Sequence, residues 1–207
     1  WLWQNGIATQ LSNNTEQNSI QNYTWSKDGK HLAWIVKDQL AIADLDGNIK
    51  TVNPKKPIYS VLSWFAEDQF LVVINDPTPG GLYLFDTKEN ILTAYDINHV
   101  QAAWVMNNQL IFSNLDGEVF TRSIDLQYSD VTPLLNLNGN ALLIDNDSLY
   151  SVDLKQNALN QYDLNGNLVS KIAQLKPTAW KVTGIKGNKL LLDQFIAINQ
   201  EIAFLQK

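Results

Sequence analysis

Apolar residues along this chain gather in short runs that are separated by polar turn residues. The runs are rich in β-branched and aromatic residues, a composition that favours strands. Pairs such as Asp46-Gly47 and Asn165-Gly166 lie between them. Such pairs favour tight hairpins because the central residues of the turn need positive φ. We find no stretch with a sustained helical period and helix caps, so the sequence predicts a nearly all-β chain.

The runs repeat with a period near forty residues. Trp25, Trp64, Trp104 and Trp180 mark this period at intervals of 39, 40 and 76 residues, and the last interval is close to two periods. One marker is missing near 141, where residues 140–145 occupy the position without a tryptophan. A polar turn and a second run follow at a similar offset in all five units, at 30–36, 68–74, 108–112, 147–153 and 188–193. A third run then lies at 39–44, 81–86, 118–122, 158–163 and 201–205. A short fourth run completes several units, at 46–52, 88–94 and 165–171. The sequence therefore contains an internal repeat of five units.

Four short antiparallel strands in one unit are typical of a β-propeller blade. Blades stack around an axis because a single sheet leaves its faces exposed. We therefore expect one domain over residues 1–207, an all-β propeller of about five four-stranded blades. The blade units span approximately 21–53, 58–96, 98–137, 139–175 and 178–207. As structural anchors on or just after the innermost strands, largely buried between blades, we expect Trp25, Trp64, Trp104 and Trp180.

The two ends of the chain decide how the ring closes. The fifth unit has three expected strands, and residues 1–11 have the pattern of an outer strand without inner ones. The simplest arrangement pairs residues 6–11 with residues 201–205, so that 1–11 closes a five-bladed ring and hides its edges. The alternative is that the chain belongs to a larger ring of six or more blades.

The first unit resembles a known repeat. Residues 23–34 read YTWSKDGKHLAW, which is similar to the W/F-S-P-D-G-K-x-I/L-A-F signature of TolB-like propellers. Residues 10–12, QLS, resemble the QLT that ends the preceding repeat in that family. The chain departs from the signature at Lys27, where the family has proline. The second unit, at 63–68, lacks the glycine, and the later units keep only the strand spacing.

This resemblance implies a setting outside the cytoplasm. TolB-like repeats occur in periplasmic TolB, in gating propellers of prolyl-oligopeptidase-like peptidases, and in the periplasmic parts of CadC-like transmembrane transcriptional regulators. The chain begins at Trp1 and holds a single methionine, Met106, which indicates a processed chain or a fragment. We expect the extracytoplasmic domain of such a regulator, tethered by a missing upstream segment, with its DNA-binding and membrane-spanning parts elsewhere.

Charge and composition exclude several classes of partner. The chain has 15 Lys+Arg against 21 Asp+Glu, a net charge of -6, so we expect this domain to bind no nucleic acid. Its apolar runs fall far short of the roughly 18 residues of a membrane span, so we expect no membrane insertion by this segment. The absence of cysteine excludes disulfides, thiolate metal sites and cysteine nucleophiles without fixing the compartment.

The candidate metal ligands do not form a set. His31 and His99 occupy non-equivalent positions in their units, whereas a histidine-based metal site needs two or three converging ligands. Residues 44–48, DLDGN, are similar to the start of an EF-hand loop, but Lys55 stands at the twelfth position, where calcium needs a bidentate glutamate. The pattern favours a hairpin turn, and we expect no metal and no cofactor.

Candidate catalytic residues are equally sparse. Asp145 and Asp147 could perform acid–base chemistry in a cleft, but their position around a turn favours solvated carboxylates. Trp1, Trp3 and Trp34 fall off the repeat period, and only the first two could stand exposed for stacking on a sugar or base. No nucleophile elbow, phosphate loop or dinucleotide fingerprint is present. We therefore name no catalytic, cofactor-binding or metal residue and leave the ligand site open.

Three functions remain as hypotheses. The first is a non-catalytic sensory module that binds a protein or a small ligand. The second is a propeller enzyme that uses carboxylates on carbohydrate, and the third is the accessory propeller of a peptidase. An enzyme of the second kind needs at least two carboxylates, or a histidine, within about 10 Å in one pocket.

Overall fold

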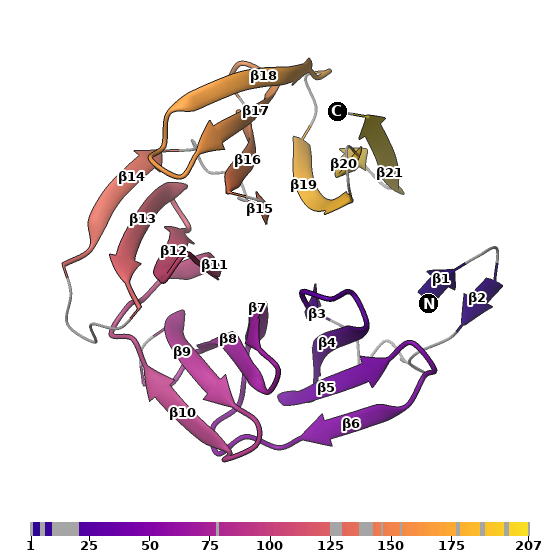
Figure 1. The fold of residues 1–207 in the computed structure, drawn as a ribbon, viewed down its shortest axis with the longest axis vertical. Coiled ribbons are helices and arrows are strands. Elements are labelled where there is room, and N and C mark those ends of the chain that lie inside the picture. The colour runs from indigo at the N-terminus through magenta and orange to yellow at the C-terminus, as the bar shows by residue number, and fades with distance from the viewer. Residues whose placement is uncertain are drawn as a thin grey trace. The chain divides into compact units, whose positions relative to one another are not determined.

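A computed structural model of the chain describes residues 2–4, 7–9, 21–77, 79–124, 130–136, 143–145, 147–153, 155–176, 179–186, 189–196 and 199–206. Within these ranges every regular element is a β-strand (Figure 1). No helix in the described ranges has the length and apolar character to cross a membrane.

The strands form four four-stranded sheets, and neighbours in each sheet follow chain order. The first sheet holds β3 (Gln21–Trp25), β4 (His31–Val36), β5 (Gln39–Asp44) and β6 (Ile49–Val52). The second holds β7 (Ser60–Ala66), β8 (Gln69–Ile74), β9 (Gly81–Asp86) and β10 (Ile91–Ala94). The third holds β11 (Val100–Met106), β12 (Gln109–Asn114), β13 (Glu118–Ser123) and β14 (Thr132–Asn136). The fourth holds β15 (Leu143–Asp145), β16 (Ser148–Asp153), β17 (Ala158–Asp163) and β18 (Leu168–Gln174).

Two smaller sheets complete the described strands. One is a three-stranded sheet of β19 (Ala179–Lys186), β20 (Lys189–Ile196) and β21 (Asn199–Gln206). The other is a hairpin of β1 (Leu2–Gln4) and β2 (Ile7–Thr9). Each of the five larger sheets lies inside the blade unit expected from the sequence. The chain is an all-β propeller.

The chain divides into two compact units, residues 1–104 and 105–207, and the division falls within β11. The first unit holds the hairpin and the first two sheets, and the second holds β12–β14 and the two sheets that follow.

The N-terminal segment differs from the single strand expected there. Leu2 pairs with Thr9 and Gln4 with Ile7, so the segment folds back on itself as a hairpin. Residues 5 and 6, which fall between the two strands, lie outside the described residues. The expected pairing of residues 6–11 with 201–205 stays a prediction.

An apolar core joins the first and second sheets of the first unit. Every residue of β8 after Gln69 is buried, as expected for a central strand covered on both faces. The core residues come from both sheets: Ala33, Ile35, Leu40, Val52, Ile58, Val61, Phe70, Val72, Ile74 and Phe85. Ile42 and Trp64 are partly buried and pack against this cluster. In the second unit, Tyr150, Val152 and Leu159 form a smaller buried cluster.

The four periodic tryptophans all lie on the first strand of a sheet. Trp25 ends β3, Trp64 lies in β7, Trp104 in β11 and Trp180 in β19. Trp64 and Trp104 are partly buried, but Trp25 is 40% exposed, so its expected burial is wrong. Trp25 is the last residue of β3 and precedes the turn at 26–30, so its side chain lies at the end of the sheet. The side chain of Trp180 lies outside the described residues.

Candidate functional site

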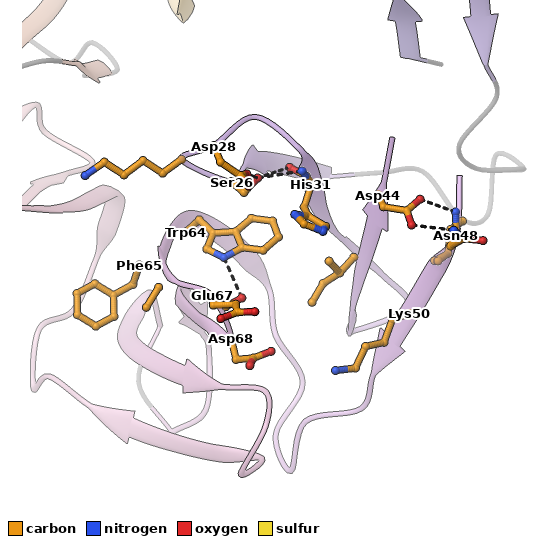
Figure 2. A pocket seen from close by; sticks show the side chains of 14 residues that line it. Ser26, Asp28, His31, Asp44, Asn48, Lys50, Trp64, Phe65, Glu67 and Asp68 are labelled. Atoms are coloured by element: carbon orange, nitrogen blue, oxygen red, sulfur yellow. Dashed lines mark hydrogen bonds between the residues drawn. The ribbon is translucent and has the colours of Figure 1, made fainter. Parts of the chain in front are cut away.

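A cavity of about 660 Å³ opens between the first and second sheets (Figure 2). The turn from β3 to β4, the turn from β5 to β6 and the turn from β7 to β8 surround it. Its volume falls in the range of about 300–1,000 Å³ that is usual for small-ligand sites. The whole cavity lies within the first unit, so it depends on the packing of two neighbouring blades.

Trp64 forms the aromatic wall of the cavity. Its ring centroid lies 4.5 Å from that of Phe70 and 6.0 Å from that of His31, and both pairs are tilted. The indole Nε1–H donates to the backbone oxygen of Glu67 at 3.2 Å. The core behind the wall and this hydrogen bond hold the indole beside the β7–β8 turn (Figure 2).

The β3–β4 turn is closed by side chain to backbone hydrogen bonds. Ser26 Oγ donates to Asp28 Oδ1 at 2.7 Å and accepts from the backbone N–H of His31 at 2.9 Å. The backbone N–H of Lys30 also donates to Asp28 Oδ1, at 3.0 Å. The bond from Ser26, followed by that from Lys30, lowers the pKa of the Asp28 carboxyl below its ordinary value. The segment that resembles the TolB-like signature is thus a self-contained turn with an ionised aspartate.

The β5–β6 turn is built in a related way. Asp44 Oδ1 accepts from the backbone N–H groups of Asp46 and Asn48 at 3.0 and 2.9 Å, and Oδ2 accepts from Asn48 Nδ2 at 2.7 Å. The Asn48 side chain contributes most to lowering the pKa of Asp44. Gly47 has a φ of 89°. The hairpin turn expected for residues 44–48 is confirmed.

Replacing Asn48 with alanine is expected to raise the pKa of Asp44, because the largest cause of its lowering is removed. A carboxyl with a lowered pKa stabilises the folded state above its unfolded pKa, and that stability is lost as pH falls through the folded pKa. A carboxyl-resonance NMR titration of both proteins measures the change. Asp163, which accepts the same bonds in the second unit, is the internal control and should not move. An unchanged Asp44 would contradict this account of the turn.

Other charged groups around the cavity have at most one long hydrogen bond from the residues that the structure describes. Lys27, Lys50 and the Glu67 carboxylate have no hydrogen bond or ion pair with any described residue. Asp68 Oδ1 receives only a long bond from Thr87 Oγ1, at 3.5 Å. Figure 2 shows Lys50 from β6 and Asp68 from the β7–β8 turn pointing toward each other across the cavity. The site therefore presents charges of both signs to whatever occupies it.

Of the residues singled out as chemical candidates, the structure places His31 and, from the 44–48 turn, Asp44 and Asn48 beside this cavity. His31 lines it, whereas His99 lies in the loop before β11 with a φ of 58°. Asp147 accepts a hydrogen bond from Asn107 Nδ2 at 2.9 Å, and the side chain of Asp145 lies outside the described residues. Trp34 is 2% exposed and packs against small residues of β5. Trp1 and the side chain of Trp3 are not described.

No three His, Asp or Glu side chains in the described part of the chain are placed to hold a metal ion. Sequence reasoning missed Lys50, Glu67 and Asp68. The repeat period contained a signal for these residues, because the turn after Trp25 and the turn after Trp64 occupy equivalent places in adjacent blades. Equivalent turns of neighbouring blades meet at one end of the groove between them.

Comparisons with known proteins support the architecture. No family model matches the chain, and no curated protein matches it. A putative TolB from Agrobacterium tumefaciens has a TM-score of 0.71 at 11% identity, over 91% of this chain and 77% of that one. This similarity shows a propeller fold.

Two further solved structures resemble the chain at similarly low sequence identity. A catalytically inactive virginiamycin B lyase from Staphylococcus aureus, solved with quinupristin, has a TM-score of 0.61 at 15% identity, over 95% of this chain and 73% of that one. A nidogen/laminin complex contains a chain with a TM-score of 0.59 at 11% identity, over 75% of this chain and 64% of that one. At these identities the likeness concerns the fold alone.

Proposed function

We propose that this chain is a non-catalytic, ligand-binding sensory propeller, and that the cavity between its first two blades is the binding site. The observation that supports this is the combination of an aromatic wall with charged side chains that have no partner among the described residues. Side chains that are left unsatisfied around a cavity of ligand size are available to fix the orientation of a ligand.

The hydrogen-bonded carboxylates of the cavity favour binding over catalysis. A glycosidase needs one carboxylic acid whose pKa is raised, so that it can protonate the leaving group. Asp28 and Asp44 instead have lowered pKa values, because hydrogen bonds from their own turns stabilise the charged form. These two aspartates supply fixed negative charge and are poorly suited to act as general acids.

The same cavity also supports a second candidate, an enzyme. Glu67, Asp68 and His31 line it together, and these are the residue types that a carboxylate-based propeller enzyme needs in one pocket. The similarity to a lyase propeller agrees with this candidate as far as fold goes.

A ligand panel tests the first candidate against the second. The purified chain is heated with neutral glycosides, organic anions and organic cations at millimolar concentration, and products are followed by mass spectrometry. We expect at least one class to raise the melting temperature without being consumed. The shift should shrink when Glu67 and Asp68 are replaced by glutamine and asparagine. Conversion of a ligand that stops in the same variant would favour the enzyme.

For the cellular role, we propose the extracytoplasmic domain of a membrane-anchored transcriptional regulator. The TolB-like segment at residues 23–34 and the acidic balance of the chain support this setting. Fusions of the complete reading frame to a reporter that is active only outside the cytoplasm test it. We expect activity when the reporter follows Lys207. A reporter active only in the cytoplasm would contradict the proposal.

A further inference from the structure

The charges around the cavity in the first unit favour a cation. Four carboxylates line it, against two lysines: Asp28, Asp44, Glu67 and Asp68, and Lys27 and Lys50. Negative charge is therefore in excess by two when His31 is neutral. A concave site with an excess of one sign of charge concentrates ligands of the opposite sign.

The carboxylates divide into two kinds by what they already bind. Asp44 has both oxygens occupied by hydrogen bonds within its own turn, so it acts on a ligand only through its field. The Glu67 carboxylate has no partner among the described residues, and Asp68 has only its long bond to Thr87. Asp28 accepts two hydrogen bonds at Oδ1 from its own turn, so Glu67 and Asp68 are the carboxylates with the fewest hydrogen bonds from the described residues.

The wall beside these carboxylates is aromatic and apolar. Trp64, Ile42 and Phe65 line the cavity. The hydrogen bond from Trp64 Nε1 to the backbone oxygen of Glu67 holds the turn that carries Glu67 and Asp68 next to the indole. A cation on the face of a tryptophan is attracted by the electron density of the ring. A flat cation with an aliphatic stem satisfies both features of the site.

From this juxtaposition we infer that the cavity binds a guanidinium group on an aliphatic stem, the chemistry of an arginine side chain. The inference rests on the proposed function and names the ligand class of the same site. The guanidinium lies against Trp64 and donates to the carboxylates of Glu67 and Asp68, because its planar fork both stacks on aromatic rings and pairs with carboxylates. Its source is a free arginine derivative or an arginine within a peptide.

Lys50 places a positive charge in the same cavity and so opposes the binding of a cation. Its ammonium points across the cavity toward Asp68 (Figure 2), yet it forms no ion pair there with any described residue. An entering cation shares this space with Lys50 and is repelled by it. Removing the lysine charge should therefore strengthen cation binding and weaken the binding of an anion.

Calorimetric titration with N-acetylarginine amide tests the inference. We expect saturable binding at millimolar concentration, weakened about tenfold or more by the double change Glu67→Gln and Asp68→Asn, since charge-assisted pairs to both carboxylates are lost. Lys50→Gln should tighten binding about two- to fivefold. No binding by the parent, or equal binding by the double variant, would overturn the inference.

A matched control separates local pairing from overall charge. Glu89→Gln with Asp96→Asn makes the same charge change at exposed positions of the second blade that do not line this cavity. This control should bind N-acetylarginine amide within about twofold of the parent, because screening at physiological salt reduces distant charge effects. A loss equal to that of the cavity variant would show a nonspecific charge effect and contradict the inference.

Further titrations show whether the guanidinium group comes from a peptide or from a free arginine derivative. They also separate the guanidinium inference from the proposed binding function. Tighter binding of acetyl-Gly-Arg-Gly-amide than of N-acetylarginine amide would assign the site to a peptide, and equal binding to the free derivative. N-acetylglutamine amide lacks the cation and should not bind. If a neutral glycoside or an anion binds instead, and binding depends on the cavity residues, the guanidinium inference fails while the binding function stands. If no class of ligand binds in a cavity-dependent way, both fail.

Discussion

Replacing Phe70 with alanine is expected to lower the free energy of unfolding by about 3–5 kcal/mol, since it leaves a cavity in the core. Phe70 is fully buried and pairs across the sheet with Trp64 on β7 and Phe85 on β9. Its ring lies against the indole of Trp64, which forms the aromatic wall of the cavity. The same change should therefore weaken ligand binding as well as stability. Urea unfolding followed by circular dichroism measures the first effect.

An exposed apolar residue on the same sheet provides the comparison for Phe70→Ala. Ile91 lies on β10 and is 49% exposed, so Ile91→Ala should cost less than about 1 kcal/mol. If the two variants unfold at the same urea concentration, β8 is not the centre of the core that joins the first two blades.

Replacing Gly166 with alanine is expected to cost about 2–4 kcal/mol, for two separate reasons. Gly166 has a φ of 82°, which L side chains rarely adopt, and an added Cβ would lie 2.6 Å from the backbone oxygen of Leu134. The neighbouring atom belongs to β14, so the close approach joins two blades of the second unit. This close contact can be relieved only if the backbone at Gly166 or Leu134 moves. Thermal and urea unfolding of the variant measure the loss.

Gly47 is the natural control for this variant. It occupies the equivalent place in the turn that Asp44 closes, with a φ of 89°, and nothing lies within 4 Å of its added Cβ. Gly47→Ala should therefore cost only the conformational term, about 1–2 kcal/mol. Equal losses at Gly47 and Gly166 would show that the contact with Leu134 has no energetic weight.

The strands and the repeat could be predicted from the sequence because their signals are local. Alternating apolar runs and Asp-Gly or Asn-Gly pairs report on a few neighbouring residues. The turn at 44–48 follows from such a signal. Other hairpins are less visible: Lys37 and Asp38 both have positive φ between β4 and β5 without a glycine. Tertiary pairing imposes that geometry on residues that do not select it.

The cavity between the first two blades could not be predicted in the same way, because it depends on which residues of two blades meet. Lys50 lies on β6 and Asp68 lies in the β7–β8 turn, so the two residues are eighteen positions apart and belong to different sheets. Asp28 and Asp44 belong to recognisable turns, but nothing in those turns indicates that they border one cavity. Trp25 and Trp64 share the same repeat position, yet only Trp64 lines the site. The repeat places residues in a blade, whereas packing between blades creates the site.

The most direct test of the central claim, that the cavity between the first two blades binds a guanidinium ligand, is a crystal structure of the chain grown with N-acetylarginine amide. We expect density for the ligand in this cavity, with the guanidinium against Trp64 and within hydrogen-bond distance of the Glu67 and Asp68 carboxylates. An empty cavity at saturating ligand concentration, or ligand bound only elsewhere on the chain, would contradict the account.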